Sequence, residues 1–246
     1  CNKIDLYINF ENEISASDLN TLKRYIKRRL ENEPSQYIIG KSNFYGRDFY
    51  VDNNVLIPRP ETEILINASI EFLSMKGNPE IIDIGTGSGC IGITLAKEIP
   101  SSNVIAIDFS EKALDVAEKN AKNIGITNID FVKSDFLKQS IDFRADLLVS
   151  NPPYIPKTEI STLMADVKEY EPSEALTDNL DGLEFYRFFS RKFDPMIKID
   201  GALIVEVGKD KHPLEAKKIF EQSGHMNIEM INDYNGDIRV LKVIKC

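Results

Sequence analysis

The apolar positions of this chain change their period near residue 40. An α-helix is predicted in the first part, where apolar residues recur at intervals of three and four after the N-cap candidate Ser17 and before Pro34. Its apolar stripe consists of Leu19, Leu22, Ile26 and Leu30. Residues 44–57 then show a short β-like pattern with turn signals at 46–48 and 52–54, which predicts a hairpin between two domains.

From residue 79 onward, short apolar runs alternate with helical segments, and this alternation is typical of repeated β-α units. Such units predict a parallel sheet covered by helices. The predicted strands are 81–84, 104–107, 129–132, 146–149 and 202–207, and the predicted helices are 89–98, 110–123, 182–193 and 214–223. Two last strands, 228–231 and 238–244, should form an antiparallel hairpin, because the Asn-Gly connection between them is too short for a crossover helix.

The composition is that of a soluble globular protein and argues against several other classes. The 246 residues suffice for one sizeable layered domain with a small appendage. No apolar run approaches the roughly 18 residues that span a bilayer, and no segment has the pattern of a secretion signal. We therefore expect a cytoplasmic monomer without membrane contact. Its cysteines, Cys1, Cys90 and Cys246, form neither a metal-binding nor a disulfide pattern, so no metal is expected.

The charge balance narrows the choice of partners. The chain carries 30 Lys and Arg residues against 39 Asp and Glu residues, which gives a formal net charge of −9. A protein with this charge repels duplex DNA or RNA at long range. We therefore expect no direct binding of nucleic acid.

A glycine-rich loop after a buried strand indicates a nucleotide-cofactor site. Residues 81–91 read Ile-Ile-Asp-Ile-Gly-Thr-Gly-Ser-Gly-Cys-Ile. Glycines let such a loop turn sharply and let a cofactor touch the backbone, while the following helix presents unpaired N–H groups. Residues 87–92 also satisfy the dinucleotide pattern G-x-G-x-x-G, so NAD competes with S-adenosylmethionine at this point. The candidate cofactor contacts in the loop are Gly85, Thr86, Gly87, Ser88 and Gly89.

Acidic residues at the ends of successive strands favour S-adenosylmethionine over NAD. Asp83 precedes the loop, where its carboxylate suits a cationic amino-acid group and disfavours a pyrophosphate. Asp108 ends the second strand, where it can accept hydrogen bonds from ribose hydroxyls in either cofactor. At the end of the third strand, Asp135 can accept from an adenine amino group and Phe136 can pack on the base. These three acids and Phe136 complete the predicted cofactor site.

The tetrapeptide Asn151-Pro152-Pro153-Tyr154 follows the fourth strand, which a doubly wound sheet places beside the first. Its two prolines remove two backbone donors and leave carbonyl groups free to accept. Asn151 Oδ1 and the Pro152 carbonyl can accept both N–H hydrogens of a planar amine, so that the nitrogen lone pair faces a methyl donor. Tyr154 can lie against the planar group. We predict methyl transfer to a planar nitrogen, with Asn151, Pro152 and Tyr154 as catalytic residues.

From residue 34 onward, the chain resembles the release-factor glutamine N5-methyltransferase family, also called HemK or PrmC. The matching segments are 58–63 (Pro-Arg-Pro-Glu-Thr-Glu), 83–91, 151–154, 170–172 (Tyr-Glu-Pro) and 181–187 (Asp-Gly-Leu-Glu-Phe-Tyr-Arg). The resemblance implies an α/β fold, that of a class I S-adenosylmethionine-dependent methyltransferase with a seven-stranded Rossmann-like sheet and an antiparallel last strand. It also implies an N-terminal helical substrate-docking domain, residues 1–42, a β-hairpin linker with a connecting helix, residues 43–78, and a catalytic domain, residues 79–246.

The resemblance further implies the substrate and its pocket. The substrate is the glutamine of the Gly-Gly-Gln loop in class 1 peptide-chain release factors, and S-adenosyl-L-homocysteine is the second product. The resemblance implies that residues 151–154 hold the glutamine and that Asn151 also contacts the cofactor. It also implies Arg59, Glu61 and Thr62 as pocket walls. The stretch before the hairpin is shorter than the family's N-terminal domain, so we expect the docking domain to be incomplete.

Three other functions stay open on the sequence. A ribosomal-protein glutamine N5-methyltransferase shares the same catalytic logic and differs mainly outside the core. A DNA adenine N6-methyltransferase also acts on a planar exocyclic amine, but it needs a basic target-recognition region, for which this acidic chain has little sequence left. A non-enzymatic module that binds S-adenosylmethionine or NAD would leave the acceptor tetrapeptide without a role.

Overall fold

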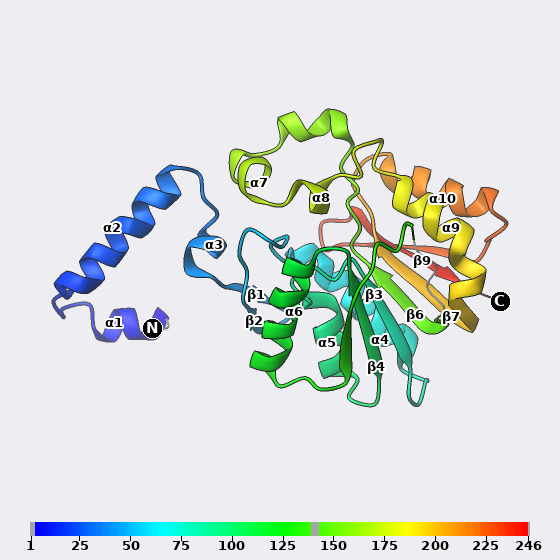
Figure 1. Ribbon diagram of the computed structural model, residues 1–246, viewed down its shortest axis with the longest axis horizontal. Helices are drawn as coiled ribbons and strands as arrows, with labels where there is room; N and C mark the ends of the chain where they lie inside the picture. The colour runs from blue at the N-terminus through cyan, green and yellow to red at the C-terminus, as the bar shows by residue number, and fades with distance from the viewer. Residues whose placement is uncertain (1–2, 139–142, 246) are drawn as a thin grey trace.

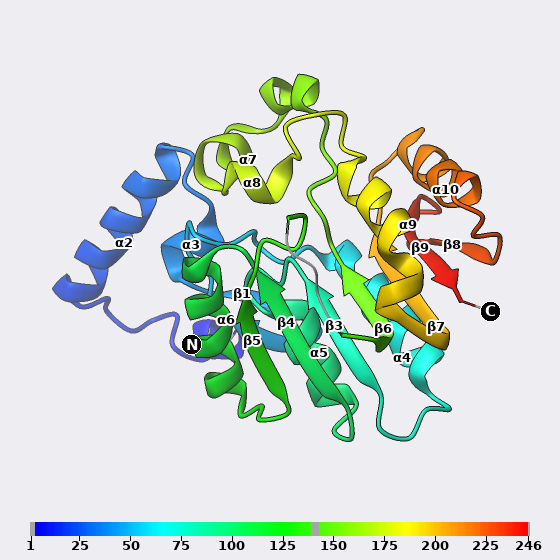
Figure 2. The ribbon, with the colours of Figure 1, turned by 45° about the vertical axis from the view of Figure 1, so that its right-hand side comes forward.

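The computed structural model describes residues 3–138 and 143–245. A seven-stranded mixed sheet forms its centre, with the strand order β5-β4-β3-β6-β7-β9-β8 (Figures 1 and 2). The strands are β3 (Glu80–Ile84), β4 (Asn103–Asp108), β5 (Ile129–Lys133), β6 (Ala145–Ser150), β7 (Ile197–Glu206), β8 (Ile228–Asn232) and β9 (Ile238–Ile244). The predicted α/β class with a seven-stranded sheet is therefore confirmed.

Helices cover both faces of the sheet, which explains why its central strands are apolar on both sides. Ile81 and Leu147, which are paired in register, pack on one face in the cluster that contains α4 (Glu63–Leu73) and α5 (Cys90–Glu98). The next pair, Ile82 and Leu148, packs on the other face. That second face is covered by α9 (Glu184–Met196) and α10 (His212–Gln222), while α6 (Glu111–Ile124) flanks β4 and β5.

The order of the strands places the candidate site. β3 lies between β4 and β6 and pairs in parallel with both. Strands β4 and β5 are added on one side of β3 and β6 and β7 on the other, so β3 is the topological switch point of the sheet. Ligands bind in open α/β sheets at the carboxyl ends of the strands beside such a switch point. The glycine-rich loop follows β3 and the tetrapeptide 151–154 follows β6, so the two predicted motifs meet there, as the sequence indicated.

The last two strands form the predicted antiparallel hairpin, with an additional feature. β9 pairs with β8 on one side and with β7 on the other, and both pairings are antiparallel. Asp233 closes the connection by accepting hydrogen bonds from the backbone N–H groups of Asn235 and Asp237. In the sheet, β9 lies between β7 and β8, and β8 is an edge strand.

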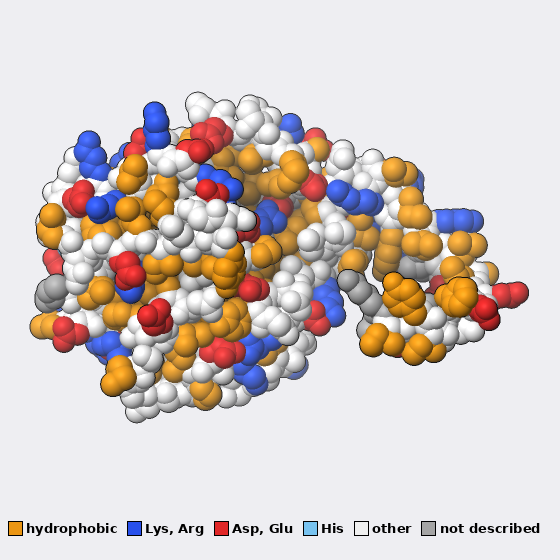
Figure 3. All heavy atoms as spheres, turned by 180° about the vertical axis from the view of Figure 1, so that it is seen from behind, with side chains coloured by type: hydrophobic (Ala, Val, Ile, Leu, Met, Phe, Trp, Pro, Cys, Tyr) orange, Lys and Arg blue, Asp and Glu red, His pale blue; other side chains and the backbone are white. Residues whose placement is uncertain are grey.

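The N-terminal helices extend away from the sheet (Figures 1 and 2). They are α1 (Lys3–Ile8), α2 (Ala16–Leu30) and α3 (Ser35–Ile39). The N-cap of α2 is Ser15 and not the predicted Ser17, because Ser15 accepts a hydrogen bond from the backbone of Asp18. α2 has no buried residue, and its apolar side chains lie on the surface of this arm (Figure 3). α3 joins the arm to the segment that follows the hairpin, since the buried Tyr37 hydroxyl donates to the Val55 carbonyl at 2.6 Å.

The predicted hairpin at 44–57 is shorter and begins earlier. Its strands are β1 (Ser42–Phe44) and β2 (Arg47–Phe49), joined by Tyr45 and Gly46 at φ 49° and 72°. Two successive positive φ angles are typical of the turns that match the twist of a hairpin. Residues 50–59 form neither helix nor strand and run along the site instead.

Short elements surround the site at the carboxyl end of the sheet. The 3₁₀ turn η1 (Pro60–Thr62) leads into α4, which packs against β6, β7 and β9. Farther along the chain lie η2 (Lys157–Thr162), α7 (Ala165–Tyr170) and α8 (Ser173–Leu176). The proposed boundary near residue 78 stays a prediction. Over the described ranges 3–138 and 143–245, none of the helices combines the length and the apolar character that crossing a membrane requires.

Candidate active site

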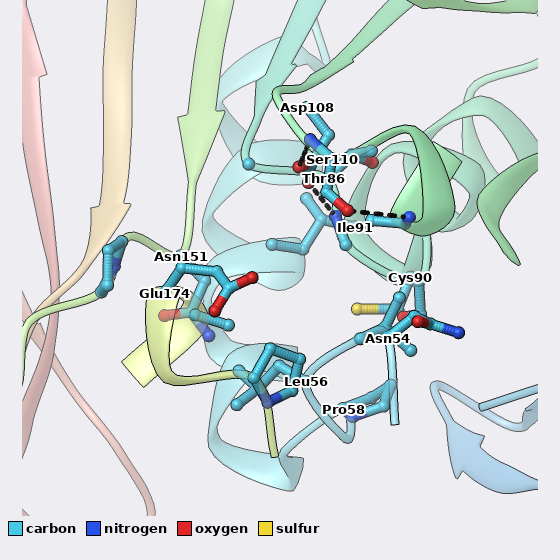
Figure 4. Close-up of a pocket in the computed structure, with 18 of the residues that line it drawn as sticks. Asn54, Leu56, Pro58, Thr86, Cys90, Ile91, Asp108, Ser110, Asn151 and Glu174 are labelled. Carbon is cyan, nitrogen blue, oxygen red and sulfur yellow. Dashed lines mark hydrogen bonds between the residues drawn. The ribbon is translucent and has the colours of Figure 1, made fainter. Parts of the chain in front are cut away.

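A pocket of about 910 Å³ opens at the carboxyl ends of β3, β4 and β6 (Figure 4). The glycine-rich loop and Asp108 form one wall, and residues 54–59 form another. Asn151 and Glu174 lie together on one side in the view of Figure 4, away from Asp108 and Ser110. The lining contains the predicted site residues Arg59, Gly85, Thr86, Gly87, Ser88, Asp108, Phe136, Asn151 and Pro153.

The glycines of the loop serve two different purposes. Gly85 and Gly87 have φ angles of 71° and 54°, and a Cβ on either residue would meet nothing within 4 Å. Their backbone therefore faces open space in the pocket, where a ligand can approach it. Gly89 also has a positive φ, but its Cβ would lie 2.5 Å from the side chain of Ile93 and 3.1 Å from that of Ala117. The third glycine thus allows the helix to pack closely and does not line the pocket.

Asp83 lies beneath the loop and outside the pocket lining. Its Oδ2 accepts hydrogen bonds from the Thr86 hydroxyl at 2.6 Å and from the Gly92 N–H at 2.9 Å. Its Oδ1 is buried without a hydrogen-bond partner. The structure therefore places this carboxylate where it fixes the loop's shape, and its predicted contact with the cofactor stays a prediction. Burial raises the pKa of Asp83 to about 6.

The raised pKa of Asp83 predicts a pH-dependent stability. A carboxyl group whose pKa is higher in the folded chain gains stability on protonation and loses it as the pH rises through the folded value. The non-titrating variant Asp83→Asn does not have this dependence. Between about pH 5 and about pH 7.5, the unaltered chain should lose on the order of 1 to 2 kcal/mol relative to the variant. Chemical denaturation of both proteins at the two pH values measures this difference, and a pH-independent difference would contradict the expectation.

Asp108 presents a fixed carboxylate to the pocket. Its Oδ2 accepts from the Gly87 N–H and its Oδ1 accepts from the Ser110 N–H, both at 2.9 Å. Burial raises the pKa of Asp108, and these backbone hydrogen bonds oppose the rise. A carboxylate has about four acceptor positions, so capacity remains for the hydroxyl groups of a ligand.

The residues that follow β5 divide between the pocket and the surface. Phe136 lines the pocket, is buried, and stacks on Phe189 with ring centroids 6.0 Å apart. Asp135 does not line the pocket, and its carboxylate pairs with Lys138 at 2.6 Å. Glu61 is likewise absent from the lining. The cofactor roles of Asp135 and Phe136 and the substrate role of Glu61 stay predictions.

The residues of this pocket fit S-adenosylmethionine. The open backbone of Gly85 and Gly87 can receive a ligand closely, and the Asp108 carboxylate has free acceptor positions for ribose hydroxyls. The Phe136 ring supplies an apolar surface for a planar base. Asp108 and Phe136 are thus available for the ribose and the base to which the sequence assigned them, and the individual contacts stay predictions.

Asn151 lies between this pocket and a second one. The second pocket has a volume of about 600 Å³ and shares Leu56, Arg59, Asn151 and Ala175 with the first. Pro153 lines the first pocket, whereas Pro152 and Tyr154 line the second. The tetrapeptide therefore lies between the two pockets. The assignment of methyl donor to the first pocket and acceptor to the second stays a prediction.

A buried hydrogen-bond network behind Asn151 was not predicted from the sequence. Asn151 Nδ2 donates to Thr62 Oγ1 at 3.3 Å, and Thr62 Oγ1 donates to Glu206 Oε2 at 2.6 Å. The Tyr154 hydroxyl donates to Glu206 Oε1 at 3.0 Å. Glu206, the last residue of β7, is 1% exposed. Burial raises its pKa, while the Thr62 and Tyr154 hydroxyls and the charge of Arg239 oppose that rise. The only signal in the sequence is an acid at the end of an apolar run.

A second buried acid holds the wall that both pockets share. Arg59 pairs with Glu171 at 2.6 Å, and the Ile57 N–H donates to the same carboxylate at 3.3 Å. Glu171 is 5% exposed and lies just after α7. Burial raises the pKa of Glu171, and the charge of Arg59 opposes this effect. The pair therefore joins residues 57–59 to the α7–α8 segment, two parts of the chain whose family-like motifs the sequence had shown separately.

Comparisons with family models cover most of the chain. Residues 62–169 match the model "Methyltransferase small domain", and residues 1–40 match the model "PrmC N-terminal domain". The first range contains the glycine-rich loop and the tetrapeptide. The second contains the three N-terminal helices.

Curated relatives align over nearly the entire chain. The release factor glutamine methyltransferase of Fusobacterium nucleatum is 40% identical over 242 residues, which are 98% of this chain and 68% of that protein. The enzyme of the same name from Chlorobaculum tepidum is 39% identical over 95% of this chain and 82% of its own length. The one from Bacillus subtilis is 38% identical over 96% of this chain and 84% of its own length.

Solved structures share the fold at low sequence identity. A methyltransferase from Pyrococcus furiosus has a TM-score of 0.59 and 16% identity, and the match covers 90% of this chain and 98% of that chain. A ribosomal protein L11 methylase from Lactobacillus delbrueckii subsp. bulgaricus has a TM-score of 0.55 and 21% identity over 76% of this chain and 81% of that chain. These likenesses show the methyltransferase fold alone.

Proposed function

Because this chain belongs to the release factor glutamine methyltransferase family, we propose that it methylates the side-chain amide nitrogen, N5, of the glutamine in the Gly-Gly-Gln loop of class 1 peptide-chain release factors. S-adenosylmethionine is the methyl donor and S-adenosyl-L-homocysteine is the second product. The observation that carries the proposal is the position of Asn151 between two pockets, with the cofactor motifs on one side and Pro152 and Tyr154 on the other.

The residues on the acceptor side suit an amide substrate. An amide nitrogen is a poor nucleophile because its lone pair is delocalised, so its orientation relative to the donor decides the rate. The Asn151 Oδ1 atom and the Pro152 carbonyl can accept the two hydrogens of the substrate amide. The lone pair of the substrate nitrogen is then directed toward the methyl donor. Tyr154 lines the same pocket and offers its ring to the planar group. Bound S-adenosylmethionine supplies an electrophilic methyl group on a sulfonium sulfur.

These oxygens also act on the transition state. Positive charge develops on the amide nitrogen as the new bond to carbon forms, and fixed acceptor oxygens near its hydrogens stabilise that charge. No general base is required at this stage, because the proton can leave after transfer. Residues 151–154 therefore contribute orientation and electrostatic stabilisation.

We further propose that residues 1–42 contribute a docking surface for the release factor. Support comes from the exposed apolar side chains of the N-terminal arm, visible in Figure 3. They include Ile4, Tyr7, Ile8, Phe10, Ile14 and Leu30. The arm also contacts the segment above the site, since the Tyr170 hydroxyl donates to the Glu31 carbonyl at 2.6 Å. We propose a cytoplasmic monomer that binds no nucleic acid, in keeping with the net charge of −9.

A competition assay tests the substrate. The protein is incubated with labelled S-adenosylmethionine and a mixture of purified release factor, ribosomal proteins and DNA, and the label is then located by peptide mass spectrometry. We expect label on the glutamine of the Gly-Gly-Gln loop and none on a release factor in which that glutamine is replaced by asparagine. Label only on a ribosomal protein or only on DNA would overturn the substrate assignment and favour the corresponding alternative.

A further inference from the structure

The orientation of the Asn151 amide decides whether it can serve the proposed reaction. Rotating the amide by half a turn exchanges Oδ1 with Nδ2, two atoms of similar size and opposite hydrogen-bonding character. Only an oxygen on the acceptor side can receive a hydrogen from a substrate amide. A nitrogen there would present a donor to another donor, so some group must hold the amide in one orientation.

Thr62, which also lines the first pocket, contacts the Asn151 amide and is itself held by Glu206. Its Oγ1 lies 3.3 Å from Asn151 Nδ2 and 2.6 Å from Glu206 Oε2. Both oxygens of Glu206 accept from hydroxyls, and these bonds together with the charge of Arg239 favour the ionised carboxylate against the effect of burial on its pKa. A hydroxyl has one hydrogen to donate, and an ionised carboxylate can only accept. The Thr62 hydrogen is therefore directed to Glu206, and its lone pairs can receive only a donor. The amide of Asn151 must then place its nitrogen toward Thr62 and its oxygen away from Thr62.

Glu206 determines the direction of a second hydroxyl in the same way. The Tyr154 hydroxyl donates to Glu206 Oε1 at 3.0 Å, so one carboxylate oxygen holds Thr62, which lines the first pocket, and the other holds Tyr154, which lines the second. The backbone of Glu206 is fixed, because Glu206 pairs with Val240 of β9 and its main-chain carbonyl accepts from the buried Tyr186 hydroxyl at 2.7 Å. A single fixed acid therefore supports both Thr62 and Tyr154.

We propose that Glu206 is a positioning residue for methyl transfer, which acts through Thr62 to keep the oxygen of Asn151 directed at the substrate nitrogen. Through Tyr154, the same carboxylate fixes the ring that lines the acceptor pocket. This inference rests on the proposed function and extends it to two residues that do not belong to the tetrapeptide. Glu206 itself lines neither pocket.

The variant Glu206→Gln distinguishes a positioning role of the Glu206 carboxylate from a role in packing alone. Glutamine has nearly the same shape, but one end of its amide donates. If the amide nitrogen faces Thr62, the Thr62 hydrogen turns toward Asn151 and favours the reversed amide. If the nitrogen faces Tyr154, the tyrosine hydroxyl must redirect its own hydrogen. Both arrangements change hydrogen-bond directions around Asn151 or Tyr154 without removing an atom from the lining of either pocket.

The matched pair Thr62→Val and Thr62→Ser tests the same step at the next residue. Valine preserves the shape and removes the hydroxyl, whereas serine preserves the hydroxyl and removes a methyl group. We expect Glu206→Gln and Thr62→Val to lower kcat by about 5- to 10-fold, the effect of about one hydrogen bond. We expect Thr62→Ser to keep kcat within about twofold. The affinity for S-adenosylmethionine should change by less than about twofold in Glu206→Gln, because Glu206 lines neither pocket, whereas Thr62 lines the first pocket and its two variants are compared by kcat.

The experiment measures kcat and KM with the release factor, cofactor affinity by calorimetry, and the thermal midpoint of each variant. A purely structural role would lower the thermal midpoint without the division between valine and serine. Full kcat in Glu206→Gln, or equal losses in Thr62→Val and Thr62→Ser, would overturn the inference while the unaltered chain remained active. Failure of the unaltered chain to methylate the release factor would instead overturn the proposed function and this inference together.

Discussion

Replacing Asn151 with alanine is expected to reduce turnover by a factor of about 10 to 100 or more, since each lost hydrogen bond is worth about 1 to 3 kcal/mol. Asn151 is the residue of the tetrapeptide that lines both pockets. Its removal takes away the acceptor that orients the substrate nitrogen, but it leaves the glycine-rich loop and Asp108 in place. We therefore expect the affinity for S-adenosylmethionine to stay within about threefold.

Steady-state kinetics measures the turnover, and calorimetric titration measures the affinity for S-adenosylmethionine. Asn67→Ala is a suitable control, because Asn67 lies on the exposed side of α4 and its Oδ1 accepts only from the Tyr45 hydroxyl among the hydrogen bonds described. The control should turn over at the rate of the unaltered chain. Normal turnover in Asn151→Ala would rule out the mechanism, whereas a large loss of cofactor affinity would assign Asn151 mainly to the cofactor.

Replacing Gly182 with alanine should displace the backbone of Tyr154, which lines the second pocket. Gly182 has a φ of 81°, and a Cβ there would lie 2.2 Å from the carbonyl oxygen of Tyr154. Backbone atoms cannot give way as a flexible side chain can, so residues 154–156 must shift. We expect a loss of about 2 to 4 kcal/mol in the free energy of unfolding, the sum of backbone strain and overpacking. Turnover should fall more than cofactor affinity, because Tyr154 belongs to the acceptor side.

Gly236→Ala is the matched control for Gly182→Ala. Gly236 has a similar φ of 88°, but a Cβ there would meet nothing within 4 Å. This variant should show only the conformational cost, about 1 kcal/mol, with normal turnover. Urea denaturation and turnover below the midpoint of each variant separate the two effects. Equal destabilisation by both substitutions would show that close contact with Tyr154 does not matter.

Features that depend on the order of strands could be predicted from the sequence. The loop after β3 and the tetrapeptide after β6 follow short apolar runs, and the rules for parallel sheets bring the ends of these strands together. The strand order therefore predicts that the two motifs lie next to each other, and this prediction requires no knowledge of side-chain contacts. The direction of individual side chains is a different matter, because Asp83 and Asp135 also follow such runs and yet lie outside the pocket lining.

Contacts between distant parts of the chain could not be predicted. Thr62 and Glu206 are separated by 144 positions, and Ile57 and Glu171 by 114. No local period or turn signal relates such residues, since only the packing of α4 and the α7–α8 segment on the sheet brings them together. Two local predictions were also wrong. Ser15 and Ser17 are both suitable N-caps, and the structure uses Ser15. Residues 50–57 have a strand-like pattern, but no strand among the described residues pairs with them.

The second helix of the arm has a consequence for how the family can diversify. α2 has fifteen residues and none of them is buried, so substitutions on it change few native contacts and cost little folding free energy. If this arm recognises the protein substrate, as we propose, its surface can mutate while Thr62, Asn151 and Glu206 stay constrained by one another. Natural selection can then change which protein is recognised without altering how an amide is methylated.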